Sequence, residues 1–173
     1  MPAIYRVRQF MRASGTWLRP ARVDQELLNQ HLSPPAVALF QSMPGYDRQH
    51  ALAVFRTLVE AGHDEPDLLA AALMHDVGKS RVPGAGIRVW HRVVTVLLQS
   101  LWPELLERIG QDRPGSWRRP FFIQQHHASL GAELAEQAGC SPVTVELIRC
   151  HEEANGRGTD RLLAALQAAD SVN

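Results

Sequence analysis

An ionisable pair, His75 and Asp76, restricts how this chain can fold more than any other feature of the sequence. Residues 68–73, which only Met74 separates from the pair, are all leucine or alanine, which is typical of a buried helix. Burying an imidazole and a carboxylate there is costly unless charged partners or a metal ion compensate. His50 lies upstream of the pair, and Asp170 ends the last apolar run. We therefore interpret these four residues as one metal site, which the fold must assemble from distant segments.

Bulk properties narrow the class of protein. A chain of 173 residues favours one domain, and 45% hydrophobic residues suffice for a full core. The formal net charge is zero, so bulk electrostatics give no indication of nucleic-acid binding. The first 15 residues contain three arginines, unlike a signal peptide, and no apolar run approaches the roughly 20 residues of a transmembrane helix. Two cysteines do not form a disulfide framework, so we expect a reduced, cytoplasmic protein.

The hydrophobic pattern is helical throughout and predicts an all-α fold. Strand-type alternation of Val, Ile and Thr is absent, while Ala, Leu, Glu, Gln and Arg dominate. Ser-Pro steps at Ser33 and Ser141 indicate helix starts, and Gly62, Gly110 and Gly139 indicate helix ends. The predicted helices are 3–13, 22–31, 34–42, 46–62, 66–77, 88–109, 117–125, 127–139, 142–153 and 159–171.

A second set of histidines extends the metal site. His126 and His127 are adjacent, and His151 follows on the next helix. Imidazole and carboxylate ligands suit Fe, Mn, Zn, Ni or Co, and no thiolate is needed. Six ligands are too many for one open catalytic ion but suit two, and Asp76 has two oxygens with which to bridge them. His126 competes with His127 for the ligand role, and we favour His127.

These motifs resemble the HD-domain superfamily of metal-dependent phosphohydrolases. The ordered set His50, His75-Asp76 and Asp170 is similar to that family's H…HD…D motif. Residues 75–79 resemble the His-Asp-Ile-Gly-Lys (HDIG) form of one branch, and residues 127–132 and 148–156 are similar to further motifs of that branch. The resemblance spans about 46–171. It implies a single HD domain over residues 1–173, built as an all-α bundle with residues 1–45 as an N-terminal helical extension.

The resemblance also implies the ligand assignment. His50, His75, Asp76 and Asp170 would hold one divalent ion, Asp76 would bridge, and His127 and His151 would hold the other. Iron and manganese are favoured, with Zn, Ni, Co or Mg as alternatives.

The chain departs from the cyclic-di-GMP phosphodiesterase branch at several positions. Cys150 stands where that branch has the first histidine of a pair, and Asn155 replaces an aspartate. Thr159 and Asp160 follow Gly158, so the Gly-Tyr-Pro motif is missing. Cyclic-di-GMP specificity and a third metal ion are therefore not implied.

The expected activity is metal-dependent hydrolysis of a phosphate ester, with a nucleotide or similar small molecule as substrate. Of 18 basic residues only Lys79 is a lysine, and it lies just past the His-Asp pair. We expect Asp76, Lys79 and Glu152 to take part in catalysis. Lys79 and two arginines of the following loop, Arg81 and Arg88, would bind the phosphate.

Two other classes of function use the same framework. Some HD-domain proteins hold two irons with six such ligands and activate oxygen, and the ligands alone do not separate this chemistry from hydrolysis. Other HD domains bind nucleotides in signalling without turning them over. The sequence does not indicate the substrate or the oligomeric state.

Overall fold

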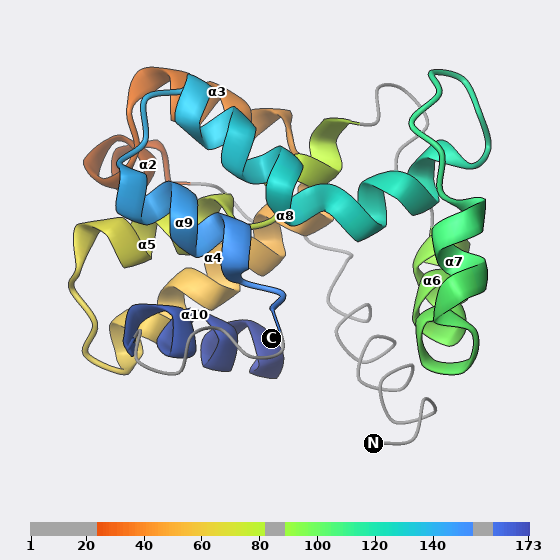
Figure 1. Ribbon diagram of the computed structural model, residues 1–173. Helices are drawn as coiled ribbons and strands as arrows, with labels where there is room; N and C mark the ends of the chain where they lie inside the picture. The colour runs from red at the N-terminus through yellow and green to blue at the C-terminus, as the bar shows by residue number, and fades with distance from the viewer. Residues whose placement is uncertain (1–23, 82–88, 154–160) are drawn as a thin grey trace. The chain divides into compact units, whose positions relative to one another are not determined.

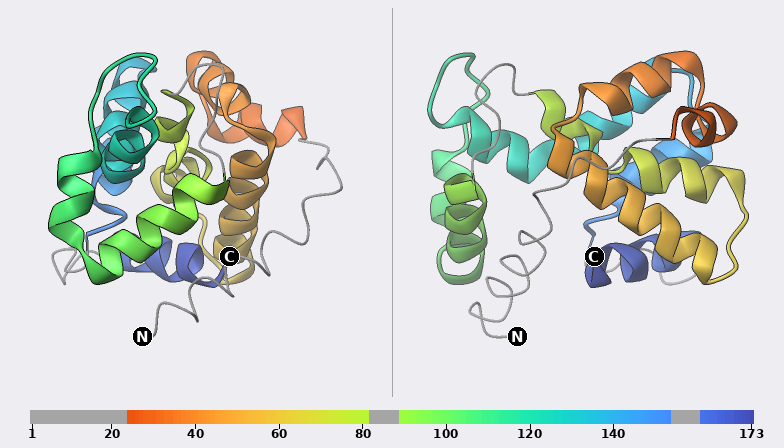
Figure 2. Two further views of the ribbon diagram at one scale, coloured as in Figure 1. Left: turned by 90° about the vertical axis from the view of Figure 1, so that its right-hand side faces the viewer. Right: turned by 180° about the vertical axis from the view of Figure 1, so that it is seen from behind.

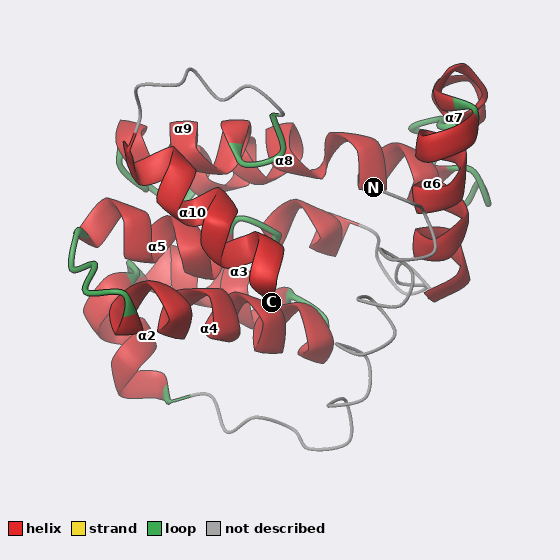
Figure 3. Ribbon diagram, turned by 90° about the horizontal axis from the view of Figure 1, so that it is seen from below, coloured by secondary structure: helices red, strands yellow, loops and turns green. Residues whose placement is uncertain are grey.

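The structure is a computed structural model that describes residues 24–81, 89–153 and 161–173. Within these ranges it contains nine α-helices and one 3-10 helix, and Figure 3 shows helices and loops there but no strand. The predicted all-α fold is therefore confirmed. The predicted helix 3–13 and residues 154–160 lie outside the described ranges.

The described residues form two compact units. One comprises Arg81–His126, and the other comprises Ala21–Ser80 and His127–Asn173, each as far as it is described. The division falls inside one helix, α8 (Arg119–Gln137), between two adjacent histidines. The single HD domain expected over 1–173, with its boundary at residue 45, stays a prediction.

The larger unit contains most of the helices. In chain order they are α2 (Gln25–His31), α3 (Pro34–Ser42), α4 (Gly45–Glu60), α5 (Pro66–Met74), the 3-10 helix η1 (Val77–Arg81) up to Ser80, the second half of α8, α9 (Pro142–Cys150) and α10 (Arg161–Val172). Helices α4, α5, α9 and α10 pack against one another (Figure 1). Their core includes Phe40, Leu58, Leu73, Ile148 and Leu166, each at most 2% exposed. Every residue of α5 from Leu68 to Met74 is buried, so the residues that follow it begin in the interior.

The smaller unit contains α6 (Val89–Leu101), α7 (Pro103–Ile109) and the first part of α8. Figure 2 shows α6 and α7 as neighbouring helices joined by a sharp corner. The prediction of one helix over 88–109 is wrong, because α7 begins with Pro103 at its first turn after Trp102, which has non-helical backbone angles. Proline lacks the amide hydrogen that would continue α6.

Two other predicted boundaries are also wrong. Segments 117–125 and 127–139 form one helix, α8, because nothing around His126 interrupts the backbone hydrogen bonds. The α-helix predicted over 66–77 ends at Met74, after which the chain tightens into η1.

The helix starts follow their capping residues. The Ser33 and Ser141 hydroxyls accept hydrogen bonds from the amides of Ala36 (3.4 Å) and Thr144 (3.0 Å), and a proline follows each serine. The helix starts predicted at these two Ser-Pro steps are therefore confirmed.

Candidate metal centre

The His-Asp pair lies immediately after α5 and is buried. His75 and Asp76 are 1% and 2% exposed. The His75 amide still donates to the Ala71 carbonyl (2.8 Å), so the histidine continues the helical geometry of a segment with no solvent-facing side. Both ionisable groups are thereby fixed in the interior of the unit.

Two of the histidines have their tautomer set by the backbone. The His75 Nδ1 lies 2.9 Å from the Ala72 carbonyl oxygen, and the His151 Nδ1 lies 2.7 Å from that of Ile148. A carbonyl oxygen only accepts, so each Nδ1 must carry the hydrogen and donate it. The lone pair of each neutral ring is then on Nε2, the arrangement that a metal-binding histidine needs.

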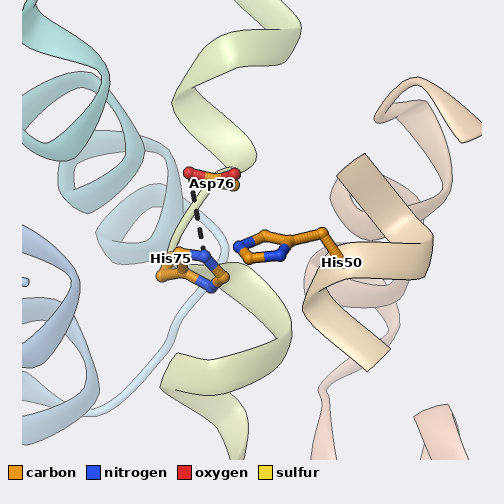
Figure 4. Close-up of side chains that lie close together, drawn as sticks. All are labelled: His50, His75 and Asp76. Carbon is orange, nitrogen blue, oxygen red and sulfur yellow. Dashed lines mark ion pairs between the residues drawn. The ribbon is translucent and has the colours of Figure 1, made fainter. Parts of the chain in front are cut away.

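One group of ligand-type atoms comes from α4 and from the end of α5. His50, His75 and Asp76 offer atoms that all lie within 4.8 Å of one another. Figure 4 shows both imidazole rings near the Asp76 carboxylate. From α10, the Asp170 Oδ1 lies 2.8 Å from the His50 Nε2 and 3.6 Å from the His75 Nε2. The structure thus brings together all four residues of the predicted H…HD…D motif.

A second group shares one member with the first. Asp76, His127 and His151 also offer atoms within 4.8 Å of one another, and all three residues are buried. The His127 Nε2 lies 3.4 Å from the Asp76 Oδ1. Asp76 is therefore common to both groups, as expected for a bridging carboxylate.

The spacing of these atoms fits divalent ions. Two donors at about 2.0–2.2 Å from one ion lie roughly 3.0–3.6 Å apart. The His75 Nε2 is 3.8 Å from the Asp76 Oδ1 and 3.6 Å from the Asp170 Oδ1, and this buried nitrogen makes no hydrogen bond. A bound cation between these three atoms would account for a nitrogen that lies close to two carboxylates and bonds to neither. The residues of the first group therefore fit a divalent ion.

The two adjacent histidines of α8 have side chains in different environments. His127 is 1% exposed and belongs to the second ligand group, whereas His126 is exposed and lies beside the Phe122 ring, with centroids 4.3 Å apart. The position of His127 thus supports the choice made from the sequence.

Lys79 and Glu152 also reach the centre. The Lys79 ammonium lies 2.5 Å from the Asp76 Oδ1, and its side chain is only 12% exposed. Burial would lower the pKa of Lys79, but the charges of Asp76 and Asp47 outweigh it and raise that pKa. The Glu152 Oε1 lies 3.6 Å from the His127 Nε2, and its side chain is half exposed. Arg88 lies outside the described residues, and nothing is described of the Arg81 side chain.

Burial and the neighbouring charges move the pKa values of the buried histidines apart. For His75, burial lowers the pKa, but Asp76 and Asp170 outweigh it and raise it to about 9. For His151, burial and the charges of His75 and His127 lower the pKa to about 3. Although burial would raise the pKa of Asp76, Lys79 and the two nearest histidines hold it well below its usual value. The ligand carboxylate is therefore ionised at neutral pH.

Asp47 is the residue of this centre that the sequence analysis missed. It is 0% exposed and lies one turn before His50 on α4. Burial, followed by the charge of Asp76, raises the pKa of Asp47 to about 7. Its spacing of three residues from His50 on one helix would have placed the two on the same face.

The cysteine at the end of α9 is not a ligand candidate in this structure. Cys150 belongs to neither ligand group among the described residues, and its thiol lies 3.4 Å from Glu146 Oε1. Burial, together with Glu146 and Glu153, raises the pKa of this thiol to about 11.

The fold and the centre together define an all-α domain with buried histidine and carboxylate groups that could hold divalent ions. A family model described as HD domain matches residues 48–173, and the chain therefore belongs to the HD domain family. The match covers every residue of both ligand groups and does not distinguish the branches of the family. No curated protein and no solved structure matches the chain. Among the described residues, none of the helices is both long enough and apolar enough to span a membrane.

Proposed function

We propose that the protein is a metal-dependent phosphohydrolase that cleaves a phosphomonoester or phosphodiester of a nucleotide or a similar small molecule. The observation that carries this proposal is the position of Asp76 in both ligand groups. One carboxylate with two oxygens can join a pair of ions, and paired ions are suited to phosphate esters. When bound, the ions would polarise phosphate oxygens and lower the pKa of a water molecule.

Each side chain of the centre has a role in this proposal. His50, His75, Asp76 and Asp170 would hold one ion, and Asp76, His127 and His151 would hold the other. The backbone bonds that fix the His75 and His151 tautomers keep the Nε2 atoms available. Iron and manganese remain the favoured metals, since mixed histidine and carboxylate ligands suit both.

Lys79 and Glu152 would act on the substrate and on the water. The Lys79 ammonium is buried next to Asp76, where a positive charge would bind a phosphate oxygen as negative charge develops. The Glu152 carboxylate lies 3.6 Å from the His127 Nε2, beside the second ligand group, where it would accept a proton from the water. We include Arg81 and Arg88 as further phosphate-binding residues on the basis of their place in the sequence.

The decisive experiment is a hydrolysis panel under anaerobic conditions with Mn²⁺ or Fe²⁺ restored. The panel contains bis-p-nitrophenyl phosphate, mononucleotides, nucleoside triphosphates and cyclic dinucleotides. Turnover that needs the metal and disappears in Asp76→Asn would support the proposal, and the preferred ester would identify the substrate class.

Two other outcomes would contradict the proposal. Iron-dependent oxygen consumption without hydrolysis would favour an oxygenase. Tight nucleotide binding without turnover, in protein with both ions bound, would favour a signalling module.

A further inference from the structure

The larger unit contains a groove that the metal centre does not use. The groove has a volume of about 620 Å³ and is lined by residues of α2, the second half of α4, the loop that follows α4, and α5. One lining residue, Val59, follows His50 by nine residues on α4, which is roughly 14 Å along the helix. No lining residue belongs to either ligand group of the described chain. The groove is therefore separate from the metal centre, and its volume is typical of pockets that bind small molecules.

The floor of the groove is apolar. Phe55 and Leu69 are 5% and 4% exposed, and Leu27 is partly buried against the same core. Val59 also lines the groove but is 46% exposed, so a large apolar side chain is left uncovered beside this floor. A ligand that covers Val59 removes apolar surface from water. The groove therefore favours a ligand with an apolar body.

The rim of the groove is acidic. Three exposed carboxylates, those of Asp24, Glu26 and Asp64, line it. Within the part of the chain that the structure describes, no lysine or arginine lines the groove. A positively charged group would therefore be attracted to this rim, and a negatively charged group would be repelled.

Two histidines also line the groove without offsetting this charge. Burial lowers the pKa of His31, so its imidazole is neutral at pH 7. The His63 Nδ1 lies 3.0 Å from the Glu65 Oε2 and is therefore engaged by a carboxylate of its own. Arg161 pairs with the same glutamate at 2.7 Å and does not line the groove. The three rim carboxylates thus determine the charge that a ligand meets.

These carboxylates and histidines are not arranged for a metal ion. Among the described residues, the groups that could hold one are those of the metal centre, and neither includes a residue of the groove. An acidic rim around an apolar floor is complementary to an organic cation instead.

We propose that this groove binds a small organic amine, with the apolar body of the ligand against Phe55 and Val59 and its ammonium group at the rim carboxylates. The site is independent of the proposed hydrolysis, so its test needs neither a substrate nor a bound metal.

Three ligands of similar shape and different charge test the proposal. They are 2-phenylethylamine, 2-phenylethanol and 3-phenylpropionate, each titrated into the ¹⁵N-labelled full chain while the amide chemical shifts are followed. We expect the amine to shift the amides of the groove with a Kd of about 1 mM. The alcohol should bind about tenfold more weakly and the carboxylate should not bind, because the rim attracts only the cation. Equal binding of the amine and the alcohol would overturn the proposal.

Two pairs of variants test the location. Val59→Trp fills the groove from an exposed position and should weaken amine binding at least about tenfold. Its control is Val143→Trp, since Val143 is 45% exposed and lies on α9 outside the groove. Asp64→Asn should weaken binding about threefold, whereas Glu136→Gln, which changes an exposed carboxylate of α8, should have no effect. Unchanged binding in both Val59→Trp and Asp64→Asn would show that the amine does not bind in the groove.

Two results would assign the groove to a protein partner and overturn the proposal. One is a shift of the groove amides with protein concentration alone, which would indicate a second copy of the chain. The other is a shift caused by a short peptide of arginine, phenylalanine and leucine when 2-phenylethylamine has no effect.

Discussion

Gly78 of η1 and Gly131 of α8 face each other in direct backbone contact. A Cβ atom on Gly78 would lie 2.7 Å from the Gly131 nitrogen, and a Cβ on Gly131 would lie 3.2 Å from the Gly78 nitrogen. The same Cβ on Gly78 would also overlap the His127 carbonyl group. Only glycine at residue 78 therefore lets η1 lie against the turn of α8 that carries His127.

This contact predicts very different effects for two glycine substitutions. Gly78→Ala should cost about 3 kcal/mol or more of unfolding free energy and reduce metal binding, because backbone atoms must move. Gly131→Ala should cost less than about 1 kcal/mol, because its closest contacts are less severe and alanine favours the helix by roughly 1 kcal/mol. Urea denaturation with metal analysis measures both effects. Equal losses of stability would show that the two backbones separate easily.

The adjacent histidines of α8 give a second, internally controlled prediction. His127→Ala should lower the metal content of the protein from two ions towards one, because it removes a ligand from the group that contains His151. His126→Ala should leave both ions bound, because that side chain is exposed beside Phe122. Elemental analysis after dialysis against Mn²⁺ or Zn²⁺ provides the count. A larger loss in His126→Ala than in His127→Ala would show that the ligand is wrongly assigned.

Much of this centre was predictable from sequence, because its residues have distinctive chemistry. His75 and Asp76 could be identified by their position after an apolar helix. His50 before them and Asp170 after them complete the family motif in chain order. The sequence alone gives no physical reason to prefer His127 to His126 as a ligand. The structure supplies one, because successive residues of a helix point in different directions. Asp47 was missed because a single acidic residue near a helix start is common on protein surfaces.

The helix boundaries depended on local details that periodicity does not report. Pro103 ends one predicted helix in the middle, although the apolar pattern continues across it. The paired histidines suggested a break that α8 does not have, because polar residues on one turn do not interrupt helical hydrogen bonds. The contact between Gly78 and Gly131 joins segments that no sequence pattern relates.

The raised pKa of His75 predicts how pH affects the protein without metal. The pKa of His75 is about 9 in the folded chain, against an ordinary value of 6.5 for a histidine, so the folded state holds an additional proton between these two pH values. The contribution of His75 to the free energy of unfolding is therefore fully present below pH 6.5 and is lost as the pH rises towards 9. His151, with a pKa of about 3, stays neutral throughout this range and does not oppose the trend. Thermal unfolding of chelator-treated protein should therefore show a decreasing Tm from pH 6.5 to 9.

Metal binding should reverse that trend. A metal ion needs the lone pair of the His75 Nε2 and must displace its proton, so affinity should rise with pH by up to about tenfold per unit until pH 9. Titration calorimetry in buffers of different ionisation enthalpy would detect the released proton. Affinity that does not change between pH 7 and 9 would mean that His75 is already neutral in the metal-free protein.

Gln167 connects the two ligand groups and gives the last prediction. Its side-chain amide donates from α10 to the carbonyls of Cys150 (3.4 Å), His151 (3.2 Å) and Glu153 (3.0 Å) at the end of α9. Cys150 is the last residue of α9, and its carbonyl also accepts from the Glu153 amide (3.0 Å), so the Gln167 amide adds a second hold on the segment that carries His151. Asp170 lies three residues further along α10.

Replacing this amide should therefore affect the ion held by His127 and His151 more than the other one. Gln167→Leu removes the donor, and Gln167→Glu places a carboxylate against the carbonyl oxygens, so the second variant should have the larger effect. We expect each substitution to lower the unfolding free energy by about 1–3 kcal/mol and to weaken the binding of one of the two ions. Titration calorimetry with the metal measures the affinity of each ion. Equal weakening of both ions would show that the amide stabilises the bundle in general and does not specifically hold the end of α9.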